Sequence, residues 1–269
     1  MAKYLFFILI ISGIALSCNS RNSNQNSTGS SQKNMNNDRD TYFQYSIWWA
    51  FVNKVFDGDL KVETLKQKGD IGLGSFDLLD GEMVMLNGVP YRITEDGMVS
   101  VGLDFQEVVY ANATFFEEDS SFTIGESVDF DGLRDQINQN LPSHNFFYAF
   151  KIHGTFKTLK LGGLYRQRKP FEYGLDVLIP NRPVFEGENI TGTMIGFYCP
   201  EFIGNINVAG YHFHFISDDL RMGGHVMEFE SDGLLVVPYD RMAKYEFMLP
   251  DNADFENVSM DKEFQYQKN

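Results

Sequence analysis

The sequence predicts an α+β fold that is built mainly from antiparallel β-sheets and contains few helices. Three observations support this prediction. Apolar and polar residues alternate along much of the middle and end of the chain, which is the pattern of half-buried strands. Asp-Gly and Asn-Gly pairs separate some of these runs, as tight hairpin turns do. Only two segments carry apolar residues at the four-residue spacing of a helix.

The first 17 residues have the composition of an export signal. Lys3 precedes an apolar run that reaches Leu16, and this run is too short for a good membrane span. The end of the run, Ala15 to Cys18, resembles the lipobox of bacterial lipoproteins, in which the cysteine becomes the lipidated first residue. We therefore expect residues 1–17 to be a lipoprotein signal peptide and Cys18 to be lipidated. The protein would then be an exported lipoprotein of a bacterial envelope, attached to the membrane by its lipid alone; a simple cleaved signal is the alternative.

Residues 18–40 are rich in Ser, Asn and Gln and predict a flexible tether before a folded region at 41–264. If Cys18 is lipidated, Cys199 is the only cysteine left, so the mature chain can form no intramolecular disulfide. A hydrophobic content of 43% is that of a globular protein with an ample core. The formal net charge of -15 argues against nucleic acid as a partner, because phosphate binding requires clustered Lys and Arg.

The folded region is expected to begin with a helix and to continue as short strands. Ile47, Phe51 and Val55 recur every four residues and Asp57-Gly58 follows as a stop signal, so we expect a helix within residues 46–56. The next expected strands cover residues 75–79, 82–86 and 89–94, with turns at Asp80-Gly81 and Asn87-Gly88. The glycines just before them lack the strand-loop-helix context of a phosphate loop.

The later part of the chain predicts a second helix among further strands. Leu133, Ile137 and Leu141 recur every four residues, with Asp129 as a cap candidate and Pro142 as the end. Alternating segments predict strands within residues 99–116, 146–156, 193–198, 205–216 and 226–237.

Three of the five histidines fall within one short stretch. In an extended strand His212 and His214 share a face, and the aromatic residues between and beside them lie on the reverse face. The segment from Ser217 to Gly224 reads as a hairpin connection, which would place His225 beside His214. Three imidazoles could then converge, and three protein ligands with an open position are typical of catalytic zinc. We expect these histidines to bind Zn²⁺; ordinary surface or core histidines are the alternative.

The pattern alone leaves the role of Glu82 open. This residue shares a strand face with Val84, so it is either a charge on an edge strand or a buried functional acid, and the pattern favours the edge strand. The remaining histidines, His144 and His153, lack neighbouring ligands and are expected to be structural or surface residues.

Several segments, taken in order, resemble the α-acetolactate decarboxylase family. They run through the chain from about Thr41 to Phe264 in the family's order, and this ordered set is specific although any one piece would be weak. The segments are Gly69–Phe76 with Leu79–Glu82, Phe146–Phe156, Gly192–Phe197, and Gly210–Phe215 with Gly223–Val226.

This resemblance implies a zinc enzyme that converts 2-acetolactate, a 2-hydroxy-3-keto acid, to acetoin and carbon dioxide. His212, His214 and His225 fall on the family's zinc ligands, Glu82 on an active-site glutamate and Ser75 on a pocket hydroxyl. The metal would chelate the hydroxyl and ketone oxygens and stabilise an enediolate, and Glu82 would either return a proton to carbon or manage protons at the metal. The glutamate assignment reverses the edge-strand interpretation.

The resemblance also implies two β-rich subdomains and a homodimer. We place the N-terminal half at about residues 41–160 and the C-terminal half at about residues 161–264.

Two positions depart from the family pattern. The family's arginine for substrate charge aligns with Gly162, and we expect Arg166 to supply this charge, with Lys160 or Arg168 as alternatives; all three could also be surface cations. The family has a glutamate at its C-terminus, for which Glu263 is the last candidate here. These departures keep a second function open, that of a lipid-anchored zinc protein that binds a small ligand without catalysis. A zinc hydrolase is a third, but no His-Glu-x-x-His motif supports it.

Overall fold

The structure is a computed structural model that describes residues 40–261. The expected signal peptide, Cys18, almost all of the expected tether and Glu263 therefore lie outside the described residues. Over the described range, no helix is long and apolar enough to cross a membrane.

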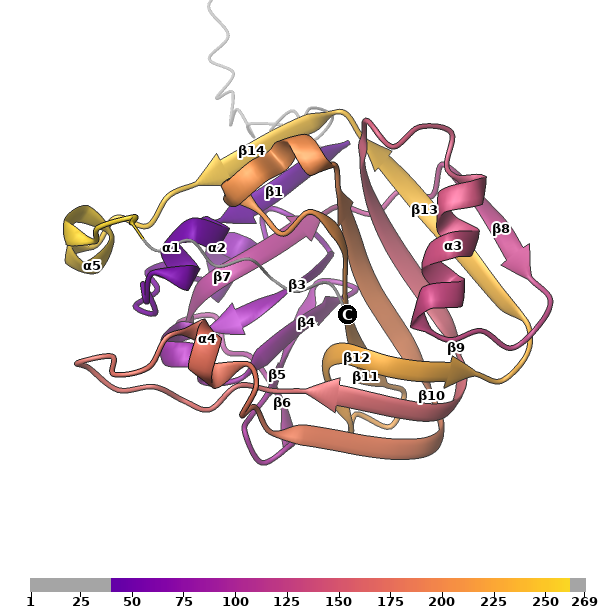
Figure 1. Cartoon of the computed structure of the whole chain (residues 1–269), viewed down its shortest axis with the longest axis horizontal. Coiled ribbons are helices and arrows are strands. Elements are labelled where there is room, and N and C mark those ends of the chain that lie inside the picture. The colour runs from indigo at the N-terminus through magenta and orange to yellow at the C-terminus, as the bar shows by residue number, and fades with distance from the viewer. Residues whose placement is uncertain (1–39, 262–269) are drawn as a thin grey trace, which may run out of the picture. The chain divides into compact units, whose positions relative to one another are not determined.

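The described strands form two sheets, as the predicted fold class requires (Figure 1). The eight-stranded sheet has the order β14-β1-β7-β3-β4-β5-β6, with β2 paired to β7. Its strands are β1 (Thr41–Tyr45), β2 (Leu60–Lys61), β3 (Ile71–Phe76), β4 (Glu82–Leu86), β5 (Val89–Ile93), β6 (Val99–Val101), β7 (Glu107–Thr114) and β14 (Lys244–Met248). Its pairs are antiparallel except for β1 with β14, which are parallel.

The six-stranded sheet has the order β10-β11-β12-β9-β13-β8, and β9 also pairs with β10. Strands β10, β11, β12 and β9 are therefore hydrogen-bonded in a closed circuit, and all pairs in this sheet are antiparallel. Its strands are β8 (Ser120–Ile124), β9 (Phe147–Gly162), β10 (Val184–Cys199), β11 (Gly210–Ser217), β12 (Gly223–Ser231) and β13 (Leu235–Met242).

Helices are short and few. They are α1 (Trp48–Val52), α2 (Val62–Leu65), α3 (Phe130–Asn140), α4 (Leu175–Leu178) and α5 (Ala253–Asn257), with 3₁₀ turns η1 (Asp77–Leu79) and η2 (Glu201–Ile206). The longest, α3, confirms the second predicted helix: the side chain of Asp129 accepts a hydrogen bond from the amide of Gly132, and the helix ends before Pro142. The first predicted helix is shorter than expected, because Ser46 and Lys54 on either side of α1 have positive φ angles.

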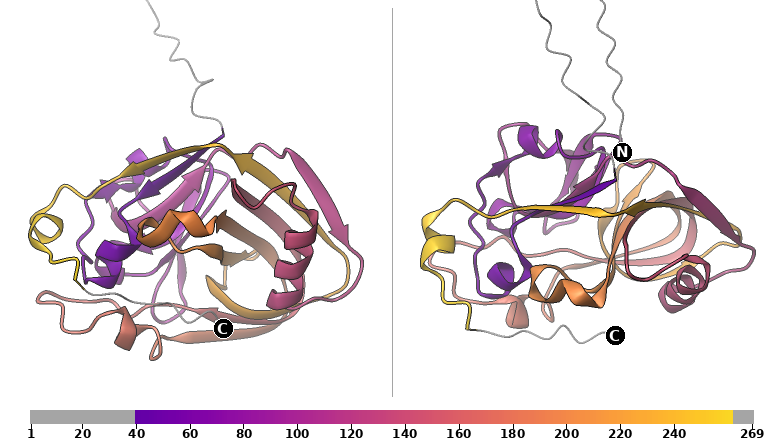
Figure 2. Two further views of the ribbon diagram at one scale, coloured as in Figure 1. Left: turned by 45° about the horizontal axis from the view of Figure 1, so that its top comes forward. Right: turned by 90° about the horizontal axis from the view of Figure 1, so that it is seen from above.

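Apolar residues of both sheets meet in a shared core. Leu73 and Val84 of the eight-stranded sheet are buried in the same cluster as Ile195 and Ile216 of the six-stranded sheet. A second cluster fills the space between the six-stranded sheet and α3, which covers its outer face (Figure 1). The chain also joins the sheets directly, since β13 runs almost without interruption into β14 (Figure 2).

Some strand boundaries differ from the prediction. Residues 77–79, expected in a strand, form the 3₁₀ turn η1, and the strand before them begins at Ile71. The predicted strand at 226–237 is two strands, because Gly233 has a positive φ and turns the chain between β12 and β13. Both sheets draw on both expected halves of the chain: β14 belongs to the first sheet, β8 to the second, and residue 160 lies within β9.

Candidate metal centre and active site

The hairpin that carries the three histidines forms as predicted. Strands β11 and β12 pair antiparallel, with His214 directly opposite His225. The amide of Ser217 donates to the carbonyl oxygen of Met222 at 2.8 Å and closes the connection between the strands. On the reverse face of β11, Phe213 and its aromatic neighbours pack in the core toward α3. The alternation of the sequence thus places imidazoles on one face and packing rings on the other.

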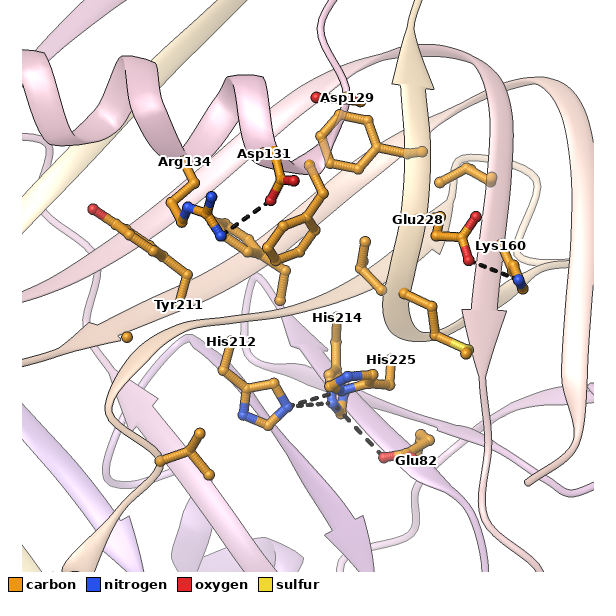
Figure 3. Close-up of a pocket in the computed structure, with 18 of the residues that line it drawn as sticks. Glu82, Asp129, Asp131, Arg134, Lys160, Tyr211, His212, His214, His225 and Glu228 are labelled. Atoms are coloured by element: carbon orange, nitrogen blue, oxygen red, sulfur yellow. Dashed lines mark hydrogen bonds and ion pairs between the residues drawn. The ribbon is translucent and has the colours of Figure 1, made fainter. Parts of the chain in front are cut away.

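The three imidazole rings converge on one point (Figure 3). Nε2 of His212 lies 3.0 Å from Nδ1 of His225 and 3.2 Å from Nε2 of His214. Nitrogens that share a tetrahedral zinc ion at about 2.0–2.1 Å lie roughly 3.3 Å from one another. These two separations are close to that value, and the three ligand atoms all lie within 4.8 Å of one another, so the three side chains could hold a single metal ion.

The protonation of the imidazoles also suits a metal. Burial lowers the pKa of all three side chains, that of His214 to about 4, so they are neutral at pH 7. Nδ1 of His214 donates to the carbonyl oxygen of Met83 at 2.8 Å, which leaves Nε2 with its lone pair toward the centre. Within residues 40–261, Nδ1 of His212 is buried and has no hydrogen-bond partner. The lone pairs of neighbouring imidazole nitrogens therefore face one another, and a cation placed between these nitrogens would stabilise the arrangement.

Glu82 lies beside this centre. It opens β4, an interior strand between β3 and β5, and its side chain is buried, so the edge-strand interpretation is wrong. Its Oε2 atom is 3.7 Å from Nε2 of His214. Burial raises the pKa of Glu82 to about 8, and the positive charge of Arg182 opposes this rise. Ser75 is directly opposite Glu82 on β3, and its hydroxyl donates to the carbonyl oxygen of Gly81 at 3.1 Å.

These side chains line one pocket. Comparison with known proteins identifies the family of the chain. The family model for alpha-acetolactate decarboxylase matches residues 42–262. The chain belongs to this family.

Individual family members are similar over most of their length. The alpha-acetolactate decarboxylase of Methanosarcina mazei is 38% identical over 233 residues, which cover 86% of this chain and 79% of the relative. That of Bacillus subtilis is 32% identical over 81% of this chain and 85% of the relative. The crystal structure of the Bacillus subtilis strain 168 protein superimposes with a TM-score of 0.79, covering 82% of this chain and 94% of that structure.

Arg166, expected to supply a charge in this member of the alpha-acetolactate decarboxylase family, lies away from the pocket. Its side chain is exposed, and one guanidinium nitrogen is 3.7 Å from Oδ2 of Asp80. Lys160 does line the pocket, but its ammonium group pairs with Glu228 at 2.7 Å (Figure 3). Arg168 is exposed and does not line it either. None of the three predicted cations points its charge at the imidazoles.

The cation beside the centre is Arg182, which sequence reasoning missed. It precedes β10 by two residues, lines the pocket with the three histidines, and donates from Nε to the carbonyl oxygen of Ile179 at 3.1 Å. No motif surrounds Arg182 in the sequence. Its place depends on the pairing of β10 with β9, which brings together residues about twenty positions apart.

Proposed function

We propose that this protein decarboxylates 2-acetolactate to acetoin and carbon dioxide, using a zinc ion held by His212, His214 and His225. The observation that carries the proposal is the convergence of three neutral imidazoles beside the buried acid Glu82, in a chain of the alpha-acetolactate decarboxylase family. Zinc is the metal proposed because three nitrogen ligands with an open fourth position are typical of its catalytic sites.

The reaction makes defined demands on the site. The bond between C2 and the carboxylate breaks, its electron pair passes toward the adjacent ketone, and C2 then takes up one proton. A metal ion on the three imidazoles supplies Lewis acidity toward the hydroxyl and ketone oxygens. The hairpin holds the three ligands on one face of the sheet, and the partly exposed rings of His212 and His225 leave the pocket side open to substrate.

Glu82 is the proposed proton donor. Burial raises the pKa of the Glu82 carboxyl group and so favours its protonated form, whereas the charge of a bound Zn²⁺ would lower that pKa. Its Oε2 atom is 3.7 Å from Nε2 of His214, so the proton lies next to the position where substrate would sit. Glu82 can deliver this proton to C2 after carbon dioxide leaves and can recover it from solvent through the pocket.

The test is an assay of metal content and of acetoin formation from racemic 2-acetolactate with three single variants. His214→Ala should lose the metal and the activity together. Glu82→Gln should keep the metal and lose activity by about 100-fold to 10,000-fold, the usual contribution of a general acid. His153→Ala is the control, because His153 is exposed on β9 and bonds Asp218 instead of the cluster, and it should keep both properties.

Two results would overturn parts of this proposal. Acetoin formation that survives both His214→Ala and Glu82→Gln would remove these residues from the reaction. Stoichiometric metal with no acetoin in the wild-type protein would favour the alternative of a zinc protein that binds a small ligand without catalysis.

We also propose that the protein is exported and anchored by a lipid on Cys18. The support is the sequence alone, in which an apolar run leads to a lipobox-like segment and a polar tether. Cys18→Ser should move the protein from the membrane fraction to the soluble fraction of cells. An unchanged membrane fraction would argue against the lipid anchor.

A further inference from the structure

We propose that Arg182 binds the carboxylate of the substrate and fixes its orientation at the metal centre. This inference rests on the proposed function, since it assigns the group that recognises the acid half of a 2-hydroxy-3-keto acid.

The position of Arg182 follows from a row of paired residues across the six-stranded sheet. On one side of β9, Gly162 is directly opposite the ligand His225 of β12; on its other side, Gly162 is opposite Val184 of β10. Directly paired residues point to the same face of a sheet. A side chain at position 162 would therefore point to the face that carries the imidazole of His225.

Arg182 occupies the space that the glycine leaves. A Cβ atom placed on Gly162 would lie 2.6 Å from Cδ and 2.9 Å from Nη1 of Arg182. The end of the arginine side chain therefore crosses the sheet surface over Gly162, in the row next to His225. The absence of a side chain at Gly162 lets the guanidinium lie against β9, and a larger residue there would displace it.

The charges of the pocket wall make a cation beside the imidazoles necessary. Acidic side chains outnumber the basic ones along this wall, and the basic ones are Arg134, Lys160 and Arg182. Of these three, Arg182 is the one that lies over Gly162, in the row of paired residues that contains His225. An anionic substrate needs a cation near the imidazoles to offset the negative charge of these acidic side chains.

The positive charge of Arg182 would favour a carboxylate placed between its guanidinium group and the imidazoles.

Orientation is the second reason for an arginine here. Decarboxylation is fastest when the bond to the carboxylate is aligned with the π-system of the ketone that accepts the electron pair. A guanidinium can bind both carboxylate oxygens with parallel hydrogen bonds, which fixes the plane of that group. Held at its ketone end by the metal centre and at its acid end by Arg182, the substrate would lose most of its rotational freedom.

The first experiment measures binding without turnover. The probe is 2,3-dihydroxy-2-methylbutanoate, in which the ketone of 2-acetolactate is reduced to an alcohol, so that no electron acceptor remains for decarboxylation; its primary amide is the uncharged comparison. Calorimetry on the metal-loaded full chain should show that Arg182→Ala weakens the acid about 10-fold to 100-fold, the range for charge-assisted hydrogen bonds. The affinity for the amide should stay unchanged. Arg182→Lys should give an intermediate loss, because an ammonium group keeps the charge without the two-pronged geometry.

The second experiment moves the charge across the sheet. In the double variant Gly162→Arg with Arg182→Ala, the guanidinium group enters the same space from β9. Position 162 is also the one at which the family resemblance implies an arginine. This variant should recover part of the acid affinity and of kcat/KM for 2-acetolactate. Arg166→Ala is the matched control, because Arg166 is exposed and lies away from the pocket, and it should change both quantities by less than about 3-fold.

The outcomes separate this inference from the proposed function. Three results would show that Arg182 is not the carboxylate ligand. The Arg182→Ala variant could bind the acid as tightly as the wild type does, or its affinities for the acid and the amide could fall by the same factor. The wild-type protein could also fail to bind the acid. If acetoin forms while Arg182→Ala keeps its kcat/KM, the function stands and the inference fails. If the wild type binds the acid through Arg182 yet forms no acetoin, the inference stands and the reaction fails.

Discussion

Glu82 and Asp240 are both buried carboxyl groups with raised pKa values, but they lie in different surroundings. Glu82 faces the pocket and the imidazoles. Asp240 accepts a hydrogen bond from the amide of Glu117 at 3.1 Å, while its Oδ1 has no partner among residues 40–261. Burial, with Asp119 and other nearby carboxylates, raises the pKa of Asp240 to about 7. A similar shift thus accompanies the proposed proton transfer at Glu82 and costs stability at Asp240.

Asp240→Asn should stabilise the protein at alkaline pH. In the folded chain Asp240 keeps its proton up to about pH 7, whereas in the unfolded chain it ionises near its ordinary pKa of about 3.9. The folded state binds more protons between these values, so the free energy of unfolding falls as pH rises through that range. Urea denaturation should show the variant about 4 kcal/mol more stable than wild type at pH 8 and nearly equal to it near pH 4. Asp232→Asn, at an exposed position, is the control; parallel pH profiles for wild type and Asp240→Asn would contradict the assignment.

At the scale of single residues, the sequence identified those whose placement depends on local pattern. His212, His214 and His225 could be grouped because strand alternation and a Gly-Gly turn lie within a few residues of each. Glu82 required the family resemblance, since alternation alone does not distinguish an interior strand from an edge strand. Arg182 could not be found either way, because its place is set by which strands flank β9.

Single elements show why some strand boundaries were misplaced. The glycines between Gly69 and Gly74 weaken a strand signal, yet β3 runs through them. A Cβ atom on Gly74 would lie 2.1 Å from the carbonyl oxygen of Tyr110 on β7, so the two strands approach too closely for any side chain there. The glycines of β3 therefore reflect tight packing against β7, which cannot be read from a single strand.

Gly74→Ala should destabilise the protein by about 3 kcal/mol, because the added methyl group meets backbone atoms that cannot move aside as a side chain would. Gly125→Ala is the matched control, since no atom lies within 4 Å of the position of its Cβ and its φ is not positive. Both variants can be compared by the midpoint of urea denaturation. Equal midpoints would show that β3 and β7 can separate without cost.

For the molecule as a whole, the site depends on how the two sheets pack. The imidazoles come from β11 and β12 of the six-stranded sheet, and Glu82 comes from β4 of the eight-stranded sheet. The hydrogen bond from His214 to Met83 crosses this junction. The sequence predicted the α+β fold class with mainly antiparallel sheets. It did not predict this junction, because no local pattern encodes which strands of the two sheets pack together.

Removal of the metal should therefore lower the stability of the whole fold. If the proposed zinc ion is present at about 100 times its dissociation constant, chelation should cost about 3 kcal/mol. For a chain of this size, that corresponds to a fall in Tm of roughly 5–10 °C. His214→Ala should start from the lower Tm and show no further change with chelator. An equal chelator effect in both proteins would place the metal elsewhere.

The spacing of the site residues along the chain also sets the order in which they can come together during folding. His212 and His225 are separated by 13 positions within one hairpin, whereas the contact between Met83 and His214 spans 131 positions. Isolated hairpins close in about 1–10 μs, and contacts between distant parts of a chain form more slowly. The imidazoles can therefore meet early, and zinc in a refolding buffer can bind the hairpin before β4 arrives. The histidines that would hold the proposed ion therefore come together before Glu82, the proposed proton donor, reaches them.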